Sequence, residues 1–383
     1  MSERATARAH VSMLLPSLAG GGAERILIEI ARGLLERSFD VDVVVVRREG
    51  SLVGAVPAGA RLVDLGVRRT AFAGRSLWRY LRRERPVAVI SALDPTNALN
   101  VAVARLARVP TASIVTQHNT VSMTAANATT WRQRIVLFAN RRVFPRASHM
   151  VAVSYGVADD MAVALHLDRA AIDVIYNPVI STRHTGAGAS VDGSAGASVH
   201  PWLRDRSGPV LLALGRLVPA KDFPNLLRAF ALLPHDHRLI LLGEGEQRRA
   251  LADLARELGV EARVDLHGFV PNPIPFLEAA DVVVLSSRWE GLPTVLIEAL
   301  PFRCGIVATD CPSGPREILE GGRWGTLVPC ADPRALADGI IGEVASPRVR
   351  SRDAWRRYEL DHAVAQYARL IDGFCRGGDV RST

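Results

Sequence analysis

Short apolar runs alternate with amphipathic stretches along most of the chain, which predicts strands alternating with helices. Residues 41–46 form a continuous β-branched run, as expected for a parallel strand buried on both faces. Residues 23–37 instead repeat apolar side chains at near-helical spacing. This alternation predicts an α/β fold with open parallel sheets and right-handed crossovers. The predicted strands are residues 10–15, 41–46, 87–91, 113–116, 149–153, 209–214, 238–242, 264–267, 281–285 and 305–309.

A segment of small and polar residues interrupts this rhythm. Residues 185–198 carry too little side chain to bury a core. We therefore expect a flexible linker or insertion at 181–208, between two doubly wound Rossmann-like domains at 1–180 and 209–359. A last helix at 360–383 is expected to return to the first domain. In such folds, ligands bind at the carboxyl ends of the strands.

The composition excludes a disordered chain and shows an uneven charge. The chain has 383 residues, of which 48% are hydrophobic and 22% charged, with a net charge of +8. Residues 1–180 hold 23 basic and 14 acidic side chains, whereas residues 181–383 hold 24 and 25. This asymmetry suggests that the first half meets an anionic membrane surface or nucleic acid, or else has a solvated arginine-rich face. Lys221 is the single lysine among the 47 basic residues.

Cysteine use and hydropathy bear on where the protein works. The four cysteines form neither a C-x-x-C pair nor a zinc-type spacing, so we expect a reducing, cytoplasmic compartment. The sequence has no apolar run of the roughly 18 residues that a membrane span requires. The cysteines are Cys304, Cys311, Cys330 and Cys375.

Two cations follow the predicted strand at 209–214. Gly215 and Arg216 come directly after it, and Lys221 lies five residues beyond Arg216. A planar guanidinium and a compact ammonium at a strand end can offset the roughly two negative charges of a diphosphate. The alternative is a surface loop that happens to carry two cations.

Two glutamates surround the helix start that follows the strand at 281–285. Glu290 lies on the loop, Pro293 is placed to begin a helix, and Glu298 falls inside that helix. Backbone N–H groups around 292–295 would point at an anion, while Glu298 could accept the two hydroxyls of a ribose. Glu290 would then face the group attached to the phosphates. The alternative is that both are ordinary acidic residues near a helix.

In these motifs the chain resembles the retaining glycosyltransferases of the GT-B fold, in the large family 4 group. The resemblance extends over nearly the whole chain and implies two Rossmann-like domains that face each other across a cleft. One departure is Tyr155, where an acidic residue is frequent. The resemblance rests on Gly215-Arg216, Lys221 and the two glutamates, and also on Gly20–Arg25, Gln117-His118-Asn119, Val153–Val157, Asn177-Pro178 and Asp310–Glu317.

The resemblance also implies roles for individual residues. Arg216 and Lys221 would hold the diphosphate, Glu298 the ribose, and Glu290 the hydroxyls of the donor sugar. His118 would lie near that sugar, although a histidine in isolation is more often packed or on the surface. The implied phosphate cradle is the backbone of Gly291, Leu292, Pro293, Thr294 and Val295. The implied base pocket is Glu244, Phe269 and Val270, and the loop approaching phosphate or acceptor is Gly20, Gly21 and Gly22.

The implied activity is retaining hexosyl transfer from a nucleotide-diphosphate sugar, a UDP-sugar, without a cofactor or a metal. Cationic groups can stabilise the departing diphosphate directly. Asp40-Val41-Asp42 is interpreted as polarity at a strand start rather than as a metal motif. Because no residue is a convincing covalent nucleophile, we expect front-face attack, with the leaving phosphate helping to take the acceptor proton.

The acceptor is expected to be a lipid-linked or polysaccharide glycan in cell-envelope biosynthesis, including lipopolysaccharide. Residues 75–85 and 131–144 are helix candidates that combine arginine with aromatic side chains, and both lie in the basic half. Such helices suit an anionic bilayer, so we expect peripheral association with the cytoplasmic face of the inner membrane. The alternative is that each is a domain helix with a solvated basic face.

The sequence also allows other functions to be considered beside glycosyl transfer, as follows from its fold and its charge. A sugar-nucleotide epimerase or hydrolase would keep the fold and change the reaction. A basic nucleic-acid-binding protein is less favoured, because the sequence contains no recognition helix, RNA-binding sheet or zinc motif. A dinucleotide-dependent dehydrogenase is excluded because Arg25 stands where the glycine motif needs a small residue. The sequence does not indicate an oligomeric state.

Overall fold

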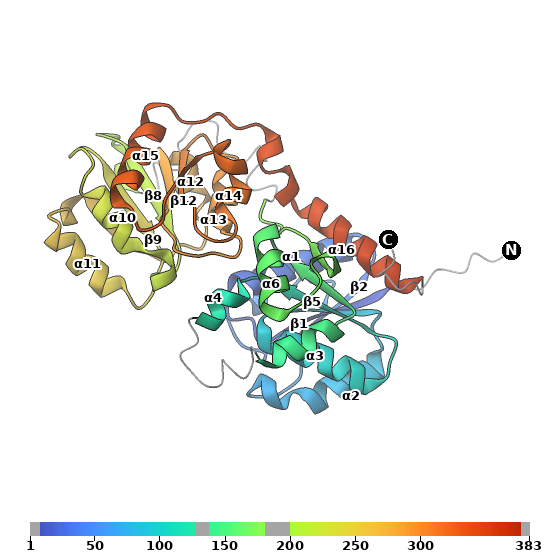
Figure 1. Cartoon of the computed structure of the whole chain (residues 1–383). Helices are drawn as coiled ribbons and strands as arrows, with labels where there is room; N and C mark the ends of the chain where they lie inside the picture. Colours follow the sequence, from blue (N-terminus) through green and yellow to red (C-terminus); the bar gives the residue numbers. More distant parts are fainter. Residues whose placement is uncertain (1–7, 127–137, 181–199, 377–383) are drawn as a thin grey trace. The chain divides into compact units, whose positions relative to one another are not determined.

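The computed structural model describes residues 8–126, 138–180 and 200–376, and the chain divides into two compact units (Figure 1). The first unit is Met1–Pro178 together with Glu359–Thr383, and the second is Val179–Tyr358. The division between Pro178 and Val179 lies close to the domain boundary expected at residue 180. The carboxyl-terminal helix groups with the first unit.

The described residues of the first unit form a seven-stranded parallel sheet in the order β3-β2-β1-β4-β5-β6-β7. Its central strands are buried along nearly their whole length, which explains their apolar runs. The order reverses between β1 and β4, so their carboxyl ends flank the switch point where such sheets bind ligands. The strands are β1 (His10–Leu15), β2 (Asp40–Val45), β3 (Arg61–Asp64), β4 (Ala88–Ala92), β5 (Ala112–Gln117), β6 (His149–Ala152) and β7 (Ile172–Val174).

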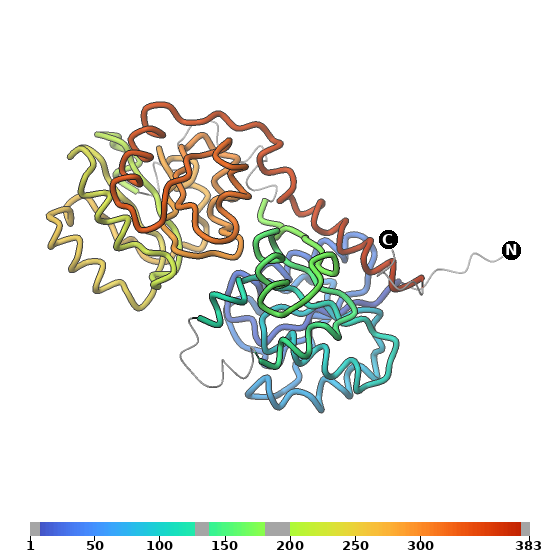
Figure 2. Tube along the Cα trace, in the orientation of Figure 1, coloured from blue at the N-terminus to red at the C-terminus, as the bar shows by residue number. Residues whose placement is uncertain are grey.

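The last helix, α16 (Leu360–Cys375), packs along α1 (Gly22–Glu36) within the first unit, as the ribbon and the tube both show (Figures 1 and 2). A glycine makes this approach possible, because a Cβ on Gly33 would lie 2.4 Å from Cγ2 of Val364. The contact explains why residues so distant in sequence belong to one unit. Other helices in the described part of this unit are α2 (Gly74–Glu84), α3 (Asp94–Ala107), α4 (Val121–Ala126) and α6 (Tyr155–Leu165), and residues 138–143 are also helical.

The second unit repeats this architecture, with a parallel sheet of six described strands in the order β10-β9-β8-β11-β12-β13. Here β8 and β11 are neighbours at the switch point. The strands are β8 (Val210–Leu214), β9 (Arg238–Leu242), β10 (Val264–Gly268), β11 (Val282–Leu285), β12 (Gly305–Thr309) and β13 (Thr326–Val328). The α-helices among its described residues are α9 (Pro201–Arg204), α10 (Phe223–Phe230), α11 (Arg248–Glu257), α12 (Ile274–Ala279), α13 (Thr294–Ala299), α14 (Pro315–Ile318) and α15 (Pro333–Ala345). In the described ranges, no helix is both long and apolar enough to cross a bilayer.

Part of the expected linker is folded, which corrects the prediction for residues 200–208. Residues 201–204 form α9, with Leu203 only 4% exposed. Pro201 occupies the first helical turn, and the His200 side chain accepts a hydrogen bond from the backbone N–H of Trp202. The remainder of the expected linker, 181–199, lies outside the described residues. So do residues 131–137, the first half of the helix expected at 131–144, whereas residues 138–143 are helical.

Asp42 lies in the amino-terminal half of β2, and its surroundings favour a structural role. It is 3% exposed and accepts hydrogen bonds from Arg61 Nε at 2.9 Å and the Tyr80 hydroxyl at 2.5 Å. His10 Nε2 completes the network at 3.0 Å. These partners outweigh the effect of burial and hold the pKa of the Asp42 carboxyl well below its usual range.

Candidate active site

Lys221 and Glu290 form an ion pair at the carboxyl ends of two neighbouring strands. Lys221 ends a short 3₁₀ turn after β8, and Glu290 lies on the loop after β11. Nζ of Lys221 donates to Oε1 of Glu290 at 2.6 Å, and the two side chains are 20% and 12% exposed. The structure thus brings together two predicted site residues that are 69 positions apart in the chain.

A chain of hydrogen bonds orients Glu290. The Ser287 hydroxyl donates to Oε1 of Glu290 at 2.6 Å, and the Thr309 hydroxyl donates to the Ser287 carbonyl at 2.6 Å. The Glu290 N–H donates to the carbonyl of Pro312 at 3.2 Å. Oε1 therefore has two donors, while Oε2 has no hydrogen-bond partner within the described part of the chain. Sequence reasoning missed Ser287 and Thr309, although both stand at or just after strand ends.

A second ion pair fastens the Lys221 turn to the Glu290 loop. The buried carboxylate of Asp222 accepts hydrogen bonds from Arg288 at 2.8 and 3.3 Å. The Ser286 hydroxyl also donates to the Lys221 carbonyl at 2.8 Å. The position of Lys221 is thus set by the loop after β11 as well as by the turn after β8 on which Lys221 lies. Asp222 and Arg288 were not predicted, because their partnership joins residues far apart in sequence.

Backbone hydrogen bonds bring the predicted diphosphate and base segments side by side beyond β8, β9 and β10. The N–H of Gly215 donates to Leu242 at 2.9 Å, and that of Gly243 to Gly268 at 2.7 Å. Gly243 has φ +146°, and a Cβ there would lie 1.9 Å from the Gly215 carbonyl oxygen, so only glycine fits. Just past these contacts, the Arg216 side chain is exposed and its guanidinium has no hydrogen-bond partner among the described residues.

The predicted base-pocket and cradle residues occupy the same edge of the sheet. Glu244 pairs with Arg248 at 3.1 Å, and the Phe269 side chain is 64% exposed beside Val270. Pro293 precedes α13, which holds Glu298 and spans only six residues. Pro293 packs closely against Gly314, where a Cβ would lie 2.4 Å from Pro293 Cδ. The cradle residues are Gly291, Leu292, Pro293, Thr294 and Val295, and their contacts with phosphate stay a prediction.

In the first unit, the predicted residues lie at the ends of adjacent strands. The glycine loop follows β1, with Gly20 at φ +107° and Gly21 and Gly22 at the start of α1. His118 directly follows β5. Between them, Asp94 begins α3 just after β4, and burial raises the pKa of its carboxyl. Asp94 was not predicted.

The hydrogen bonds of Thr116 fix the tautomer of His118. The Thr116 hydroxyl donates its single hydrogen to the Ser91 carbonyl at 2.8 Å. Its 3.0 Å contact with His118 Nε2 therefore requires the imidazole to donate from Nε2. The neutral ring then presents Nδ1 as an acceptor. Burial lowers the pKa of His118 to about 4, which keeps the ring neutral near pH 7.

We predict that His118 titrates near pH 4 in the folded protein, with an effect on stability. An unfolded histidine titrates near pH 6.5, so between these values the unfolded chain binds more protons. The free energy of unfolding should therefore fall as the pH drops from about 6.5 to about 4. NMR of the ring protons, assigned with His118→Asn, measures the titration. A midpoint near 6.5 would contradict the prediction, as would an unaltered pH dependence of stability in the variant.

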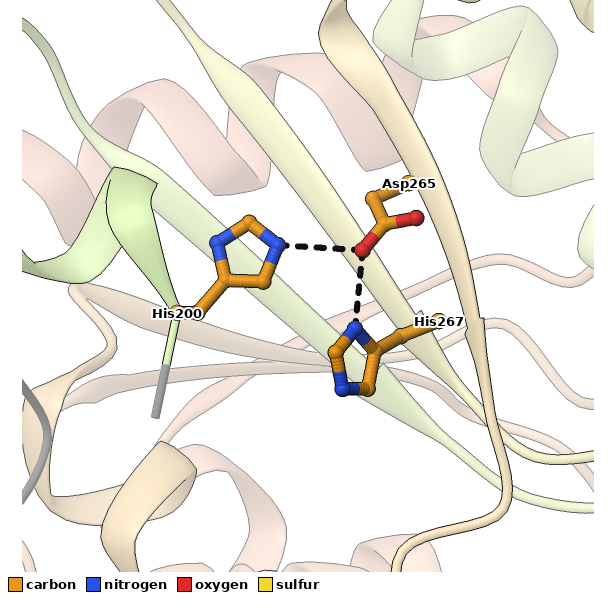
Figure 3. Close-up of side chains that lie close together, drawn as sticks. All are labelled: His200, Asp265 and His267. Carbon is orange, nitrogen blue, oxygen red and sulfur yellow. Dashed lines mark hydrogen bonds and ion pairs between the residues drawn. The ribbon is translucent and has the colours of Figure 1, made fainter. Parts of the chain in front are cut away.

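Within the described residues, one group of side chains has the donor atoms of a metal site. His200, Asp265 and His267 lie at the edge strand β10, and Asp265 Oδ2 is 3.0 Å from His200 Nε2 and 2.9 Å from His267 Nδ1 (Figure 3). The N–H of Trp202 donates to His200 Nδ1 at 3.1 Å, so a neutral His200 carries its proton on Nε2. Nε2 donates that proton to Asp265, so Nε2 of the neutral ring has no lone pair with which to bind a metal. The group is a hydrogen-bond network that joins α9 to β10.

Comparison with known families decides what kind of protein this is. Residues 200–361 match the model of the glycosyl transferases group 1, and residues 20–183 match the model described as Glycosyltransferase Family 4. The chain belongs to the group 1 glycosyltransferases. The two matched ranges include Gly20, His118, Arg216, Lys221 and Glu290.

Relatives of this glycosyltransferase include two enzymes of Campylobacter jejuni. One, named as an N-acetylgalactosaminyltransferase that acts on a diphospho-undecaprenol-linked sugar, is 30% identical over 208 residues, or 54% of each chain. The chain therefore spans about half the length of that relative. The other, named as an α-1,4-N-acetyl-D-galactosaminyltransferase acting on a PP-undecaprenol glycan, is 24% identical over 94% of this chain and 98% of its own.

The fold of this glycosyltransferase agrees with a solved structure. Anabaena HepE in complex with UDP-glucose superposes with a TM-score of 0.78 at 21% identity, over 95% of this chain and 99% of the other. Together with the two parallel-sheet units, this likeness shows the GT-B fold predicted from the sequence.

Proposed function

We propose that the protein transfers a sugar from a UDP-sugar to a lipid-linked glycan, with retention of configuration at the anomeric carbon. The observation that carries this proposal is the braced Lys221–Glu290 pair at the ends of β8 and β11. The named activities of the Campylobacter relatives support a lipid-linked acceptor, and the UDP-glucose complex of HepE supports the donor class.

The cations are suited to the departure of a nucleoside diphosphate. The Lys221 ammonium has three N–H donors and uses one on Glu290, so two are available to phosphate oxygens. Arg216 adds a fork of donors on the same edge of the sheet. As the bond from the anomeric carbon to the phosphate oxygen breaks, these groups stabilise the growing negative charge. We propose that they do so without a metal.

Glu290 is suited to hold the donor sugar. Its Oε1 is occupied by Lys221 and Ser287, and its Oε2 is the oxygen left to accept a sugar hydroxyl. The carboxylate also favours the positive charge that develops on the sugar ring. The acceptor oxygen then bonds to the anomeric carbon from the side of the leaving group, and its proton passes to the departing phosphate. In the first unit, the neutral imidazole of His118 is suited to accept a hydroxyl at Nδ1.

Binding and transfer assays test the proposal. At one hundred times its dissociation constant, a bound UDP-sugar should stabilise the fold by about 2.7 kcal/mol in a thermal-shift screen, while unrelated nucleotides should not. Transfer to a polyprenyl-diphosphate-linked sugar should persist in EDTA, and NMR should show the anomeric configuration of the donor in the product. Release of free or isomerised sugar without acceptor would favour the hydrolase or epimerase. No binding of any nucleotide sugar would refute the donor site.

A further inference from the structure

The first unit contains an arginine-lined cavity that the donor chemistry does not use. It has a volume of about 590 Å³ and is lined by Arg47, Arg68, Arg69 and Phe72. We call it the arginine pocket. Arg47 follows β2, and the other three residues follow β3. The pocket therefore opens at the carboxyl edge of the sheet, where ligands of this fold bind.

Backbone hydrogen bonds extend the strand pairing into the loops that build the arginine pocket. The N–H of Val67 donates to the Val46 carbonyl at 3.1 Å, which places the β3 loop beside the β2 loop. The N–H of Arg47 donates to Pro16 at 3.1 Å, and the N–H of Leu18 donates to Glu49 at 2.9 Å. These bonds tie the pocket to the segment that leads into the glycine loop at Gly20.

The charges of the arginine pocket are unbalanced. Arg47 pairs with Glu49 at 2.6 Å. Arg68 and Arg69 are exposed, and neither guanidinium has a hydrogen bond or an ion pair with any residue that the structure describes. Two unpaired guanidiniums on adjacent residues favour an anion with about two negative charges. Phosphate esters provide such charges in a geometry that the arginine fork matches.

An apolar side chain adjoins these cations. Phe72 is 70% exposed and lines the same cavity. An exposed phenylalanine beside two free arginines fits a ligand whose anionic group is attached directly to an apolar chain. This pairing distinguishes a lipid phosphate from inorganic phosphate or a nucleotide.

We propose that the arginine pocket binds the diphosphate of a polyprenyl-diphosphate-linked acceptor, with Phe72 against the first isoprene units. The proposal rests on the proposed function, because it names the acceptor group that the transferase holds. Arg68 and Arg69 neutralise the diphosphate, which anchors the lipid end of the acceptor. An anionic phospholipid headgroup shares this chemistry, and the experiment separates the two.

The direct test is calorimetric titration with farnesyl diphosphate, a short polyprenyl diphosphate, in the presence of saturating UDP to occupy the donor site. Arg68→Gln/Arg69→Gln should weaken binding at least tenfold. Arg75→Gln/Arg79→Gln removes the same charge from exposed positions on α2 and should change binding less than twofold. Equal binding by the wild type and both double variants would overturn the proposal. So would equal losses in both variants, because that result would reflect net charge alone.

Two further arms identify the ligand. Phe72→Ala should weaken the binding of farnesyl diphosphate several-fold and leave the binding of inorganic pyrophosphate unchanged. Unchanged binding of farnesyl diphosphate would refute the isoprene contact. In flotation with phosphatidylglycerol vesicles, Arg68→Gln/Arg69→Gln should bind as the wild type does. Loss of flotation with unchanged farnesyl diphosphate binding would assign the pocket to a phospholipid headgroup and overturn the proposal. If farnesyl diphosphate binds as expected but no UDP-sugar stabilises the protein, the proposed function fails and the pocket stands.

Discussion

Replacing Glu290 with glutamine should lower kcat by about two to three orders of magnitude, with little change in the affinity for UDP. Glutamine has the same shape, and its carbonyl oxygen can still accept from Lys221 and Ser287. The change converts Oε2, the oxygen without a partner among the described residues, into an NH₂ donor and removes the negative charge. The sugar then loses its acceptor, whereas Lys221 and Arg216 remain to bind the diphosphate.

The matched control for Glu290→Gln is Glu257→Gln, an exposed glutamate at the end of α11 in the same unit. Single-turnover kinetics should show the loss in Glu290→Gln only, and calorimetry with UDP should give similar dissociation constants for both variants. Wild-type turnover in Glu290→Gln would remove Glu290 from the mechanism. A large loss of UDP affinity would instead make it a binding residue for the nucleotide.

The sequence predicted the interior of both sheets and one edge strand, β10, but missed the other three edge strands. Buried strands such as β9 (Arg238–Leu242) and β12 (Gly305–Thr309) have long apolar runs, and their bounds were predicted as observed. The strands β3, β7 and β13 were missed. Each has three or four residues and lies at a sheet edge, where exposed positions break the apolar run. Edge strands form because a neighbouring strand offers backbone hydrogen bonds, and the hydrophobic pattern of the edge strand itself gives little indication of that neighbour.

The candidate site was predicted where chemistry is local in sequence. Glu290 and Glu298 around a helix start, and Arg216 and Lys221 after a strand, are recognisable from spacing. The residues that hold these side chains in place are not recognisable from spacing, because they are brought together only by tertiary contacts. Ser287 reads as an ordinary loop serine until the fold places it 2.6 Å from Glu290. The bond between Asp222 and Arg288 likewise joins residues 66 positions apart.

The charge asymmetry of the chain has a structural counterpart. The basic half contains the arginine pocket and the exposed face of α2, where Trp78 is 37% exposed beneath Arg82 at 5.0 Å. Several cations of the second unit are instead paired with carboxylates, among them Arg248, Arg256 and Arg288. Unpaired arginines in the first unit suit an anionic ligand or surface, because pairing there would cancel the attraction.

The final prediction concerns the single lysine of the chain. Lys221→Ala should weaken UDP binding by at least tenfold and leave the binding of uridine, which has no phosphate, nearly unchanged. The variant loses a charged hydrogen bond to the diphosphate, an interaction of about 1.5–3 kcal/mol. It also leaves Glu290 without its cation, and the freed carboxylate repels phosphate. Arg228→Ala, at an exposed cation on α10, is the matched control and should leave UDP binding unchanged.

Lys221→Arg should not restore full affinity, although it restores the charge. The lysine stem passes over Gly215, where a Cβ would lie only 3.2 Å from Lys221 Cε, and its compact ammonium fits the 2.6 Å contact with Glu290. A planar guanidinium is wider and needs a different approach to the carboxylate. Calorimetry with UDP on both variants measures the difference. Wild-type affinity in Lys221→Ala would remove Lys221 from the diphosphate site, and full rescue by arginine would show that charge alone is required there.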